Sequence, residues 1–104
     1  MTALVGLDVG TTGVKALAVG PDGAVLARAE RPYPLSMPHP GWAEQDPEDW
    51  RRAAEEALAA LGVDDIAGIG LTGQMHGLVA LDAGERVVRP AMLWNDQRTG
   101  AECR

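Results

Sequence analysis

The first residues that could do chemistry form the run Gly6-Leu7-Asp8-Val9-Gly10-Thr11-Thr12-Gly13. A carboxylate at the end of a buried strand is costly unless it is paired or binds a cation. The Gly-Thr-Thr-Gly turn can aim successive backbone N–H groups at a phosphate, with the threonine hydroxyls as further donors. Asp8 could therefore hold Mg²⁺ through water beside nucleotide phosphates, and Lys15, the chain's one lysine, adds a positive charge. The alternative is an ordinary hairpin with an exposed aspartate and a glycine-rich turn.

Two more polar clusters follow, Gly73-Gln74-Met75-His76-Gly77 and Trp94-Asn95-Asp96-Gln97-Arg98. Fixed donors and acceptors beside an apolar surface suit the recognition of a sugar. Both clusters also have a plain structural interpretation. His76 could be a hydrogen-bonded structural histidine and Met75 a core filler. Trp94 could belong to the core, with Asn95 or Asp96 as a helix N-cap.

Other motifs point to no further chemistry. The run Gly68-Ile69-Gly70-Leu71-Thr72-Gly73 has the glycine spacing of dinucleotide-binding loops, but that motif must follow a strand and open a helix. Here the glycines lie inside a strand-like run, which favours close packing of the backbone. The two histidines and Cys103 lack the spacing of zinc ligands, and the only serine, Ser36, has no partnered base.

Three short strands joined by tight turns are expected at the N-terminus, over residues 3–9, 14–19 and 24–33. They predict an antiparallel meander, with the Asp8 run at its first turn. A proline-rich connection over 32–47 follows, in which the embedded Trp42 suggests a segment that packs down.

A helix over 47–61 has the clearest local signals. Asp46 is a good N-cap, Pro47 suits the first helical position and Gly62 ends the apolar pattern. Residues 66–72 predict a strand that is buried on both faces. The remaining expected elements are extended segments over 77–81 and 86–94, and the start of a helix at 95–97. The order of elements indicates an α/β fold with a mixed sheet.

Composition restricts the classes of partner. The 104 residues carry 15 acidic and 9 basic side chains, a formal net charge of -6, and 46% of the residues are hydrophobic. This acidic balance argues against binding to nucleic acid or to an anionic membrane. No apolar run reaches the ~20 residues that span a bilayer. A single cysteine, Cys103, favours a reducing compartment, so a cytoplasmic location is expected.

Taken together and in order, these motifs resemble the N-terminal part of the FGGY family of carbohydrate kinases. The resemblance covers essentially all 104 residues and includes the stretch Trp42-Ala43-Glu44-Gln45-Asp46-Pro47 before the helix. It implies a ribonuclease H-like, actin-like ATPase fold with flanking helices. It also implies that residues 1–104 are an incomplete N-terminal domain, the sugar-binding half of a kinase that could be a homodimer.

The resemblance implies ATP-dependent, Mg²⁺-assisted phosphorylation of D-xylulose to D-xylulose 5-phosphate. Asp8 would place the metal and position the phosphate. The implied nucleotide-binding residues are Gly10, Thr11, Thr12 and Lys15, and the implied sugar-binding residues are Gln74, Met75, His76, Trp94, Asn95 and Asp96. The family's catalytic base aspartate lies beyond residue 104. We therefore expect the chain alone to be inactive, marginally stable and prone to associate.

Two alternatives to this assignment stay open. The chain could come from another FGGY kinase, acting on gluconate, ribulose or a different polyol, or it could be a non-catalytic sugar-binding remnant of the fold. A polymerising or chaperone ATPase is a poorer fit, because Gln74-Met75-His76 forms a cluster for polyols that such proteins do not need.

Overall fold

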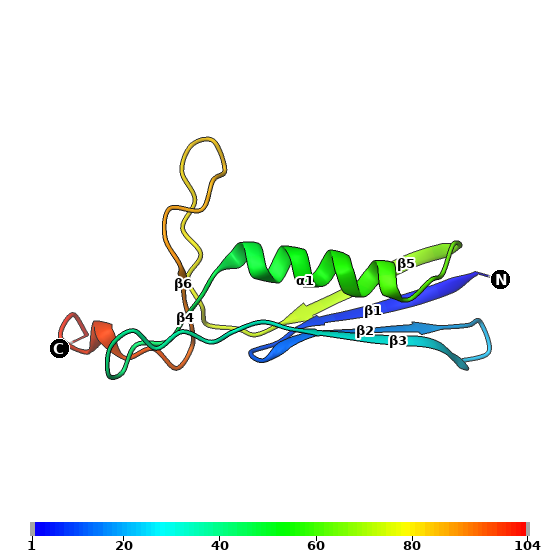
Figure 1. The fold of residues 1–104 in the computed structure, drawn as a ribbon, viewed down its shortest axis with the longest axis horizontal. Coiled ribbons are helices and arrows are strands. Elements are labelled where there is room, and N and C mark those ends of the chain that lie inside the picture. The colour runs from blue at the N-terminus through cyan, green and yellow to red at the C-terminus, as the bar shows by residue number, and fades with distance from the viewer. Residues whose placement is uncertain (1, 104) are drawn as a thin grey trace.

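A four-stranded mixed sheet with one helix on one face forms the body of the molecule in the computed structural model, which describes residues 2–103 (Figure 1). The strands are β1 (Ala3–Val9), β2 (Gly13–Val19), β3 (Val25–Pro32) and β5 (Ile66–Gly73), in the spatial order β3-β2-β1-β5. The first three strands form the expected antiparallel meander, whereas β5 pairs with β1 in parallel. The expected α/β fold with a mixed sheet is confirmed.

Helix α1 (Pro47–Ala60) begins and ends where its local signals predict. The Asp46 carboxylate accepts the N–H of Glu48 at 2.9 Å, and Pro47 occupies the first turn. Leu61 is the C-cap, followed by Gly62 with φ 64°, a left-handed conformation that glycine adopts without a steric penalty. The helix runs along one face of the sheet, with its N-terminus near the end of β1 (Figure 1).

The hydrophobic core lies between α1 and one face of β1, β2 and β3. Alternate strand residues point toward the helix, and small alanines on both sides allow helix and sheet to approach closely. The buried members of this core are Val5, Leu7, Val14, Ala16, Ala18, Tyr33, Ala53, Ala57 and Leu61. Because Leu7 faces the helix, its neighbour Asp8 lies on the opposite face of the sheet.

Strand β5 departs from the expectation of burial on both faces. It is an edge strand, and α1 packs on β1, β2 and β3 rather than on it. Leu71, which shares the helix side of the sheet with Leu7, is consequently 72% exposed. The glycines of the dinucleotide-like motif lie within this strand, as expected, and no helix follows them.

The extended segments predicted over 77–81 and 86–94 form only in part. Only β6 (Ala91–Met92) is a strand, and it pairs with β4 (Glu44–Gln45) from the proline-rich connection. Isolated bridges join Leu78 to Met92 and Leu81 to Val87. Residues 77–90 therefore form a protruding arm in which the two extended segments pair with each other only at these isolated bridges (Figure 1).

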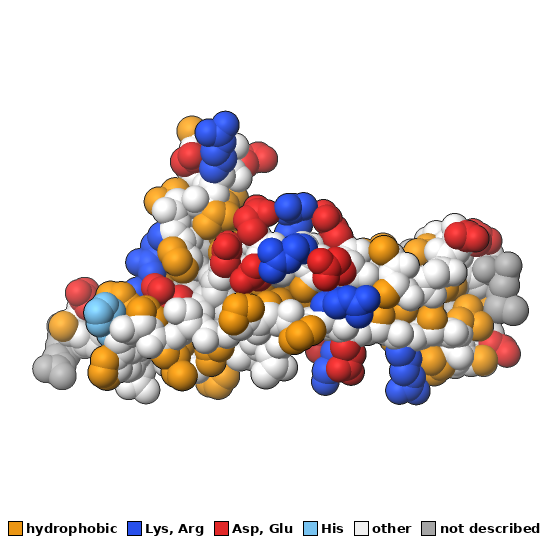
Figure 2. Space-filling model, in the orientation of Figure 1, with side chains coloured by type: hydrophobic (Ala, Val, Ile, Leu, Met, Phe, Trp, Pro, Cys, Tyr) orange, Lys and Arg blue, Asp and Glu red, His pale blue; other side chains and the backbone are white. Residues whose placement is uncertain are grey.

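The helix expected to start at 95–97 is a short 3₁₀ helix, η1 (Arg98–Gly100), with Gln97 as its N-cap. Charged side chains gather over the outer surface of α1, while hydrophobic side chains remain visible along the sheet and on the arm (Figure 2).

Within the described residues, no helix has the length and apolar character needed to cross a membrane.

Candidate functional site

The candidate site lies at the edge of the sheet where β1 and β5 both end. Because these two strands are parallel, the segments that follow them leave the same edge. The turn Gly10–Gly13 follows β1, and the segment beginning at Gln74 follows β5. The backbone N–H of Gln74 donates to the carbonyl oxygen of Val9 at 3.0 Å, which joins the two segments directly.

The turn has the conformation of a candidate phosphate-binding loop. It is closed by a hydrogen bond from the Gly10 N–H to the Gly13 carbonyl oxygen at 3.0 Å. Its own carbonyl groups point at protein donors: the Tyr33 hydroxyl donates to Gly10, and the Gln45 amide donates to Thr11 at 2.6 Å. The N–H groups of Thr11 and Thr12 have no acceptor among residues 2–103. Unpaired N–H groups in succession are the feature that binds anions.

Asp8 lies next to this turn, on the open face of the sheet. Its backbone neighbours are Lys15 on β2 and Thr72 on β5. Asp8 and Lys15 are both exposed and make no ion pair among the described residues. The negative charge of Asp8 nevertheless acts at the turn. Burial raises the pKa of Tyr33 to about 12, with the charge of Asp8 as the second, smaller cause, and the Tyr33 hydroxyl donates to the Gly10 carbonyl oxygen.

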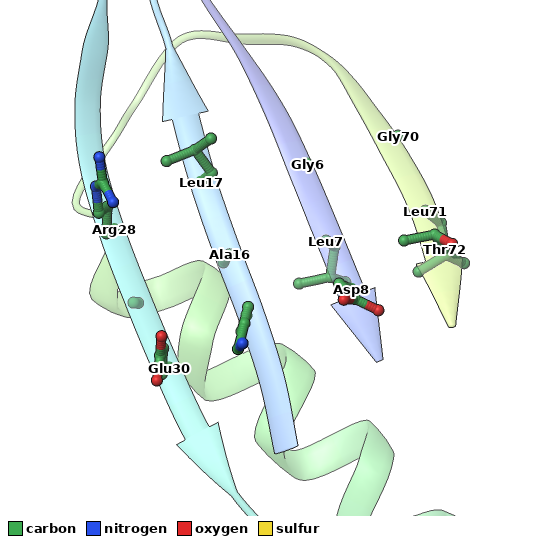
Figure 3. A pocket seen from close by; sticks show the side chains of 12 residues that line it. Gly6, Leu7, Asp8, Ala16, Leu17, Arg28, Glu30, Gly70, Leu71 and Thr72 are labelled. Atoms are coloured by element: carbon green, nitrogen blue, oxygen red, sulfur yellow. The ribbon is translucent and has the colours of Figure 1, made fainter. Parts of the chain in front are cut away.

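A hollow of about 460 Å³ extends from Asp8 over this open face. Figure 3 shows its lining from the side opposite α1, with Asp8 on β1 and Thr72 on β5 at the end nearer the turn. Gly6 and Gly70 leave the floor of the hollow without side chains.

Asp8 has the chemistry of a magnesium ligand, although no cluster of three His, Cys, Asp or Glu side chains occurs within residues 2–103. Mg²⁺ in phosphate-transferring sites is commonly held by one or two carboxylates, by waters and by the substrate phosphates. An exposed carboxylate without an ion pair, next to a turn with free N–H groups, fits that arrangement.

Gln74 binds the two halves of the site together. Its amide oxygen accepts the Thr11 hydroxyl at 3.3 Å, and its amide nitrogen donates to the side-chain oxygen of Gln45 at 3.0 Å. The following Met75 and His76 are exposed, and His76 has φ 61°. A left-handed conformation is uncommon for a residue other than glycine and often marks a functional position.

A second hollow, of about 370 Å³, opens beside this segment. Its lining includes Gln74, His76, Trp50 and Leu93, a mixture of polar and apolar side chains. Its size falls within the range of about 300–1,000 Å³ that is usual for small-molecule sites. Met75 does not line this hollow, whereas Gln74 and His76 do.

The Trp94-Asn95-Asp96 cluster divides into two environments. The indole N–H of Trp94 donates to the Thr11 hydroxyl at 3.3 Å, while the ring remains 57% exposed. Trp94 therefore reaches the turn from a third segment of the chain. Asn95 is exposed next to it.

Asp96, in contrast, is turned into the protein. Its carboxylate accepts the Ala43 N–H at 2.8 Å and both the N–H and the guanidinium of Arg98, and its side chain is 2% exposed. The Arg98 hydrogen bonds are the main cause that lowers the pKa of Asp96 far below its usual value. Arg98 also pairs with Glu44 at 2.8 Å and stacks over the Trp42 ring at 3.7 Å. These contacts attach the Trp94 segment to the proline-rich connection.

Two residues of the site, Gln45 and Tyr33, were not singled out by the motifs. Gln45 lies inside the stretch from Trp42 to Pro47 that carries part of the family resemblance, but nothing in its type or spacing indicates that it reaches Thr11. Tyr33 lies at the end of a strand, where a buried aromatic residue is ordinarily a core residue.

Comparison with known proteins matches residues 3–104 to the FGGY family of carbohydrate kinases, N-terminal domain. The chain belongs to this family. It is 47% identical over 103 residues to xylulose kinase of Escherichia coli (strain K12), covering 95% of this chain and 21% of that protein. It thus spans about a fifth of the length of this FGGY kinase.

Solved structures of FGGY kinases contain the same arrangement of elements. Xylulose kinase from Rhodospirillum rubrum is 40% identical and superimposes with a TM-score of 0.92 over 96% of this chain and 22% of that chain. Gluconate kinase from Lactobacillus acidophilus is 30% identical, with a TM-score of 0.92 over 97% of this chain and 21% of that chain. The chain therefore has the N-terminal part of the actin-like ATPase fold that FGGY kinases share.

Proposed function

We propose that this chain supplies the phosphate turn and part of the sugar pocket of an ATP-dependent kinase that converts D-xylulose to D-xylulose 5-phosphate. The observation that carries the proposal is the convergence on Thr11: its hydroxyl contacts Gln74 and Trp94, each at 3.3 Å. One residue of the phosphate turn thus touches both polar clusters expected to recognise the sugar. Phosphoryl transfer depends mainly on positioning and on charge stabilisation, which such an arrangement can provide.

In this proposal each cluster has a defined part. The Thr11 and Thr12 N–H groups would bind the transferring phosphate. Asp8 would hold Mg²⁺, which would supply positive charge to stabilise the phosphate oxygens. Gln74 and His76 face the sugar from the second hollow, with Met75, Trp94 and Asn95 beside it. Asp96 acts indirectly, because its carboxylate is already occupied by Arg98 and Ala43. Lys15, on the neighbouring strand, would add a positive charge for the nucleotide phosphates.

The main competing substrate is gluconate, because the gluconate kinase from Lactobacillus acidophilus superimposes equally well. The backbone therefore does not discriminate between the two sugars, and sequence identity favours xylulose, at 40% against 30%. A non-catalytic sugar-binding role predicts binding of the sugar without formation of ADP.

A hybrid kinase tests the proposal. In the hybrid, this chain replaces the corresponding 103-residue region of the E. coli xylulose kinase. We expect ADP formation that depends on xylulose, measured by a coupled assay, and none from the 104-residue chain alone. Preference of the hybrid for gluconate over xylulose would overturn the substrate assignment.

The two histidines of the chain provide a matched pair of variants in the hybrid. His76→Ala should raise the KM for xylulose about five- to hundredfold and leave the KM for ATP unchanged, because a sugar hydroxyl loses its partner. His39→Ala is the control, since His39 is exposed and contacts the Trp42 ring at a centroid distance of 4.4 Å, in the proline-rich connection. An equal effect of both substitutions would argue against contact between His76 and the sugar.

A further inference from the structure

Gln45 occupies the point where the phosphate turn (residues 10–13), helix α1 and the segment 74–77, called here the sugar segment, meet. Its side chain is 2% exposed. The amide nitrogen donates to the Thr11 carbonyl oxygen at 2.6 Å. The amide oxygen accepts the Trp50 indole N–H at 2.9 Å and the Gln74 amide at 3.0 Å. Through one side chain, three segments that are distant in sequence are hydrogen-bonded to each other.

The orientation of this amide follows from its partners. An indole N–H can only donate and a backbone carbonyl can only accept. The Gln45 oxygen must therefore face Trp50 and its nitrogen must face Thr11. Rotating the amide by 180° would oppose two donors at Trp50 and two acceptors at Thr11, both in a buried place where an unmet polar group is costly.

The backbone of Gln45 is held as firmly as its side chain. Gln45 pairs with Ala91 in the small β4–β6 sheet. The next residue, Asp46, caps α1, and this cap sets where the helix begins and so where Trp50 lies in the first turn. The amide of Gln45 is consequently presented to the phosphate turn from a fixed position.

Planarity of the peptide bond connects Gln45 to the phosphate. In a trans peptide the C=O and N–H of the same unit point in opposite directions. A hydrogen bond that fixes the Thr11 carbonyl therefore also fixes the direction of the Thr12 N–H. The Tyr33 hydroxyl acts in the same way on the preceding peptide, because it binds the Gly10 carbonyl and so orients the Thr11 N–H.

We propose that Gln45 is a positioning residue that orients the Thr12 N–H toward the nucleotide phosphate and couples this orientation to the sugar segment through Gln74. The inference rests on the proposed kinase function for its consequence in catalysis. Its structural part, control of the Thr11–Thr12 peptide by Gln45, is independent of which sugar is phosphorylated.

Gln45→Glu is the decisive variant, because it replaces the N–H donor at the Thr11 carbonyl with a carboxylate oxygen. The two oxygens repel until the carboxyl takes up a proton, which then serves as the donor. In the 104-residue chain, we expect the amide ¹⁵N and ¹H NMR signals of Thr12 to shift relative to wild type at pH 8 and to return as the pH falls toward 5. Gln97→Glu is the matched control, since the Gln97 side chain is exposed and makes no hydrogen bond among the described residues.

A milder variant guards against failure of Gln45→Glu to fold. Trp50→Phe keeps an aromatic ring in the first turn of α1 but removes one of the two donors, Trp50 and Gln74, that hold the Gln45 oxygen. We expect a smaller shift of the same Thr12 signals. If Thr12 is unchanged in a folded Trp50→Phe chain, or shows no pH-dependent shift in a folded Gln45→Glu chain, Gln45 only fills space and the inference is wrong.

Kinetics of the hybrid kinase give a second readout. Gln45→Glu should lower kcat/KM for ATP about ten- to hundredfold at pH 8 relative to the unsubstituted hybrid, with partial recovery near pH 6. Gln45→Leu should lower it at both pH values. If the hybrid prefers another sugar, only the substrate proposal is contradicted. The Gln45 variants can then be compared with the unsubstituted hybrid on that sugar. If both variants, Gln45→Glu and Gln45→Leu, lower kcat/KM for ATP by the same factor at pH 8 and at pH 6, the positioning role is wrong.

Discussion

At the scale of single residues, the site is built from side chains that use their hydrogen-bonding capacity on the backbone of one turn. Tyr33 and Gln45 bind the carbonyl groups of Gly10 and Thr11, and the N–H groups on the other side of these peptides have no acceptor in the part of the chain that the structure describes. A turn held in this way is already ordered before an anion arrives. Less conformational freedom is then lost on binding, which favours affinity.

The first prediction concerns Tyr33, the only tyrosine of the chain. Burial, and to a lesser extent the charge of Asp8, raises its pKa to about 12, so absorbance at 295 nm should titrate near that pH in the folded chain and near 10 in denaturant. Because the unfolded chain ionises first, the free energy of unfolding should fall as the pH rises from about 10 to about 12. Asp8→Asn should lower the folded midpoint only in part.

A midpoint near 10 in a chain that keeps its native circular dichroism would contradict this prediction. It would mean that the Tyr33 hydroxyl is accessible to water and that its bond to the Gly10 carbonyl does not persist.

Asp96 gives a second prediction, in the acid range. Arg98 holds the pKa of this carboxyl well below its usual value. Asp96 therefore adds stability that is complete above the unfolded pKa of about 3.9 and is lost as the pH falls from there toward the lowered folded pKa. Asp96→Asn should cost about 1–3 kcal/mol of unfolding free energy at pH 7 and should flatten the decline below pH 4, as measured by urea denaturation. An equally steep decline in this variant would assign the acid sensitivity to other carboxylates.

At the scale of elements, the close approach of β2 to β3 at the turn depends on a missing side chain. A Cβ on Gly13 would lie 2.6 Å from the Arg31 carbonyl oxygen and 2.9 Å from the Pro32 Cα. Both are backbone atoms, which cannot move aside without disturbing the pairing of the strands. The sequence Gly-Thr-Thr-Gly thus has a packing requirement in addition to any phosphate it binds.

We therefore predict that Gly13→Ala costs about 1–3 kcal/mol of unfolding free energy in urea denaturation. Gly6→Ala is the control, because a Cβ at that position in β1 meets no atom within 4 Å. Equal midpoints for the two variants would show that the β2–β3 pairing at the turn is looser than described.

Local signals predicted the elements far better than they predicted the site. Helix α1 was readable because Asp46, Pro47 and Gly62 act on their own neighbours in the chain. The segments expected over 77–81 and 86–94 pair only at isolated bridges and at β6, because the arm that they form stands away from the main sheet. The contact between Gln45 and Thr11 spans 34 residues and depends on how α1 lies on the sheet. No pattern within a short window contains that information.

At the scale of the whole molecule, the shape is extended. The extents are 54 × 28 × 22 Å and the radius of gyration is 16.4 Å, against about 13 Å for a compact chain of this length. The arm, the small β4–β6 sheet and η1 extend beyond the sheet-and-helix body (Figure 1). Apolar side chains on β5 stay exposed, and β5 has a free edge.

An exposed apolar edge strand is prone to pair with another copy. We predict concentration-dependent association of the 104-residue chain in sedimentation velocity, and less association for Leu71→Thr. Leu81→Thr, on the arm, is the control for the loss of another exposed leucine, which is 53% exposed against 72% for Leu71. A larger effect of the control would place the contact on the arm instead of on β5.

The single lysine has a practical consequence for studying this protein. Lys15 is exposed on β2, directly across from Asp8. Apart from the N-terminal amine, an amine-selective acylating reagent therefore finds one side-chain amine to modify, and it lies near the phosphate turn. A fluorophore or mass tag attached there reports on the open sheet face without any engineered attachment point. The extent of labelling measures how far other chain segments, ions or nucleotides shield that face.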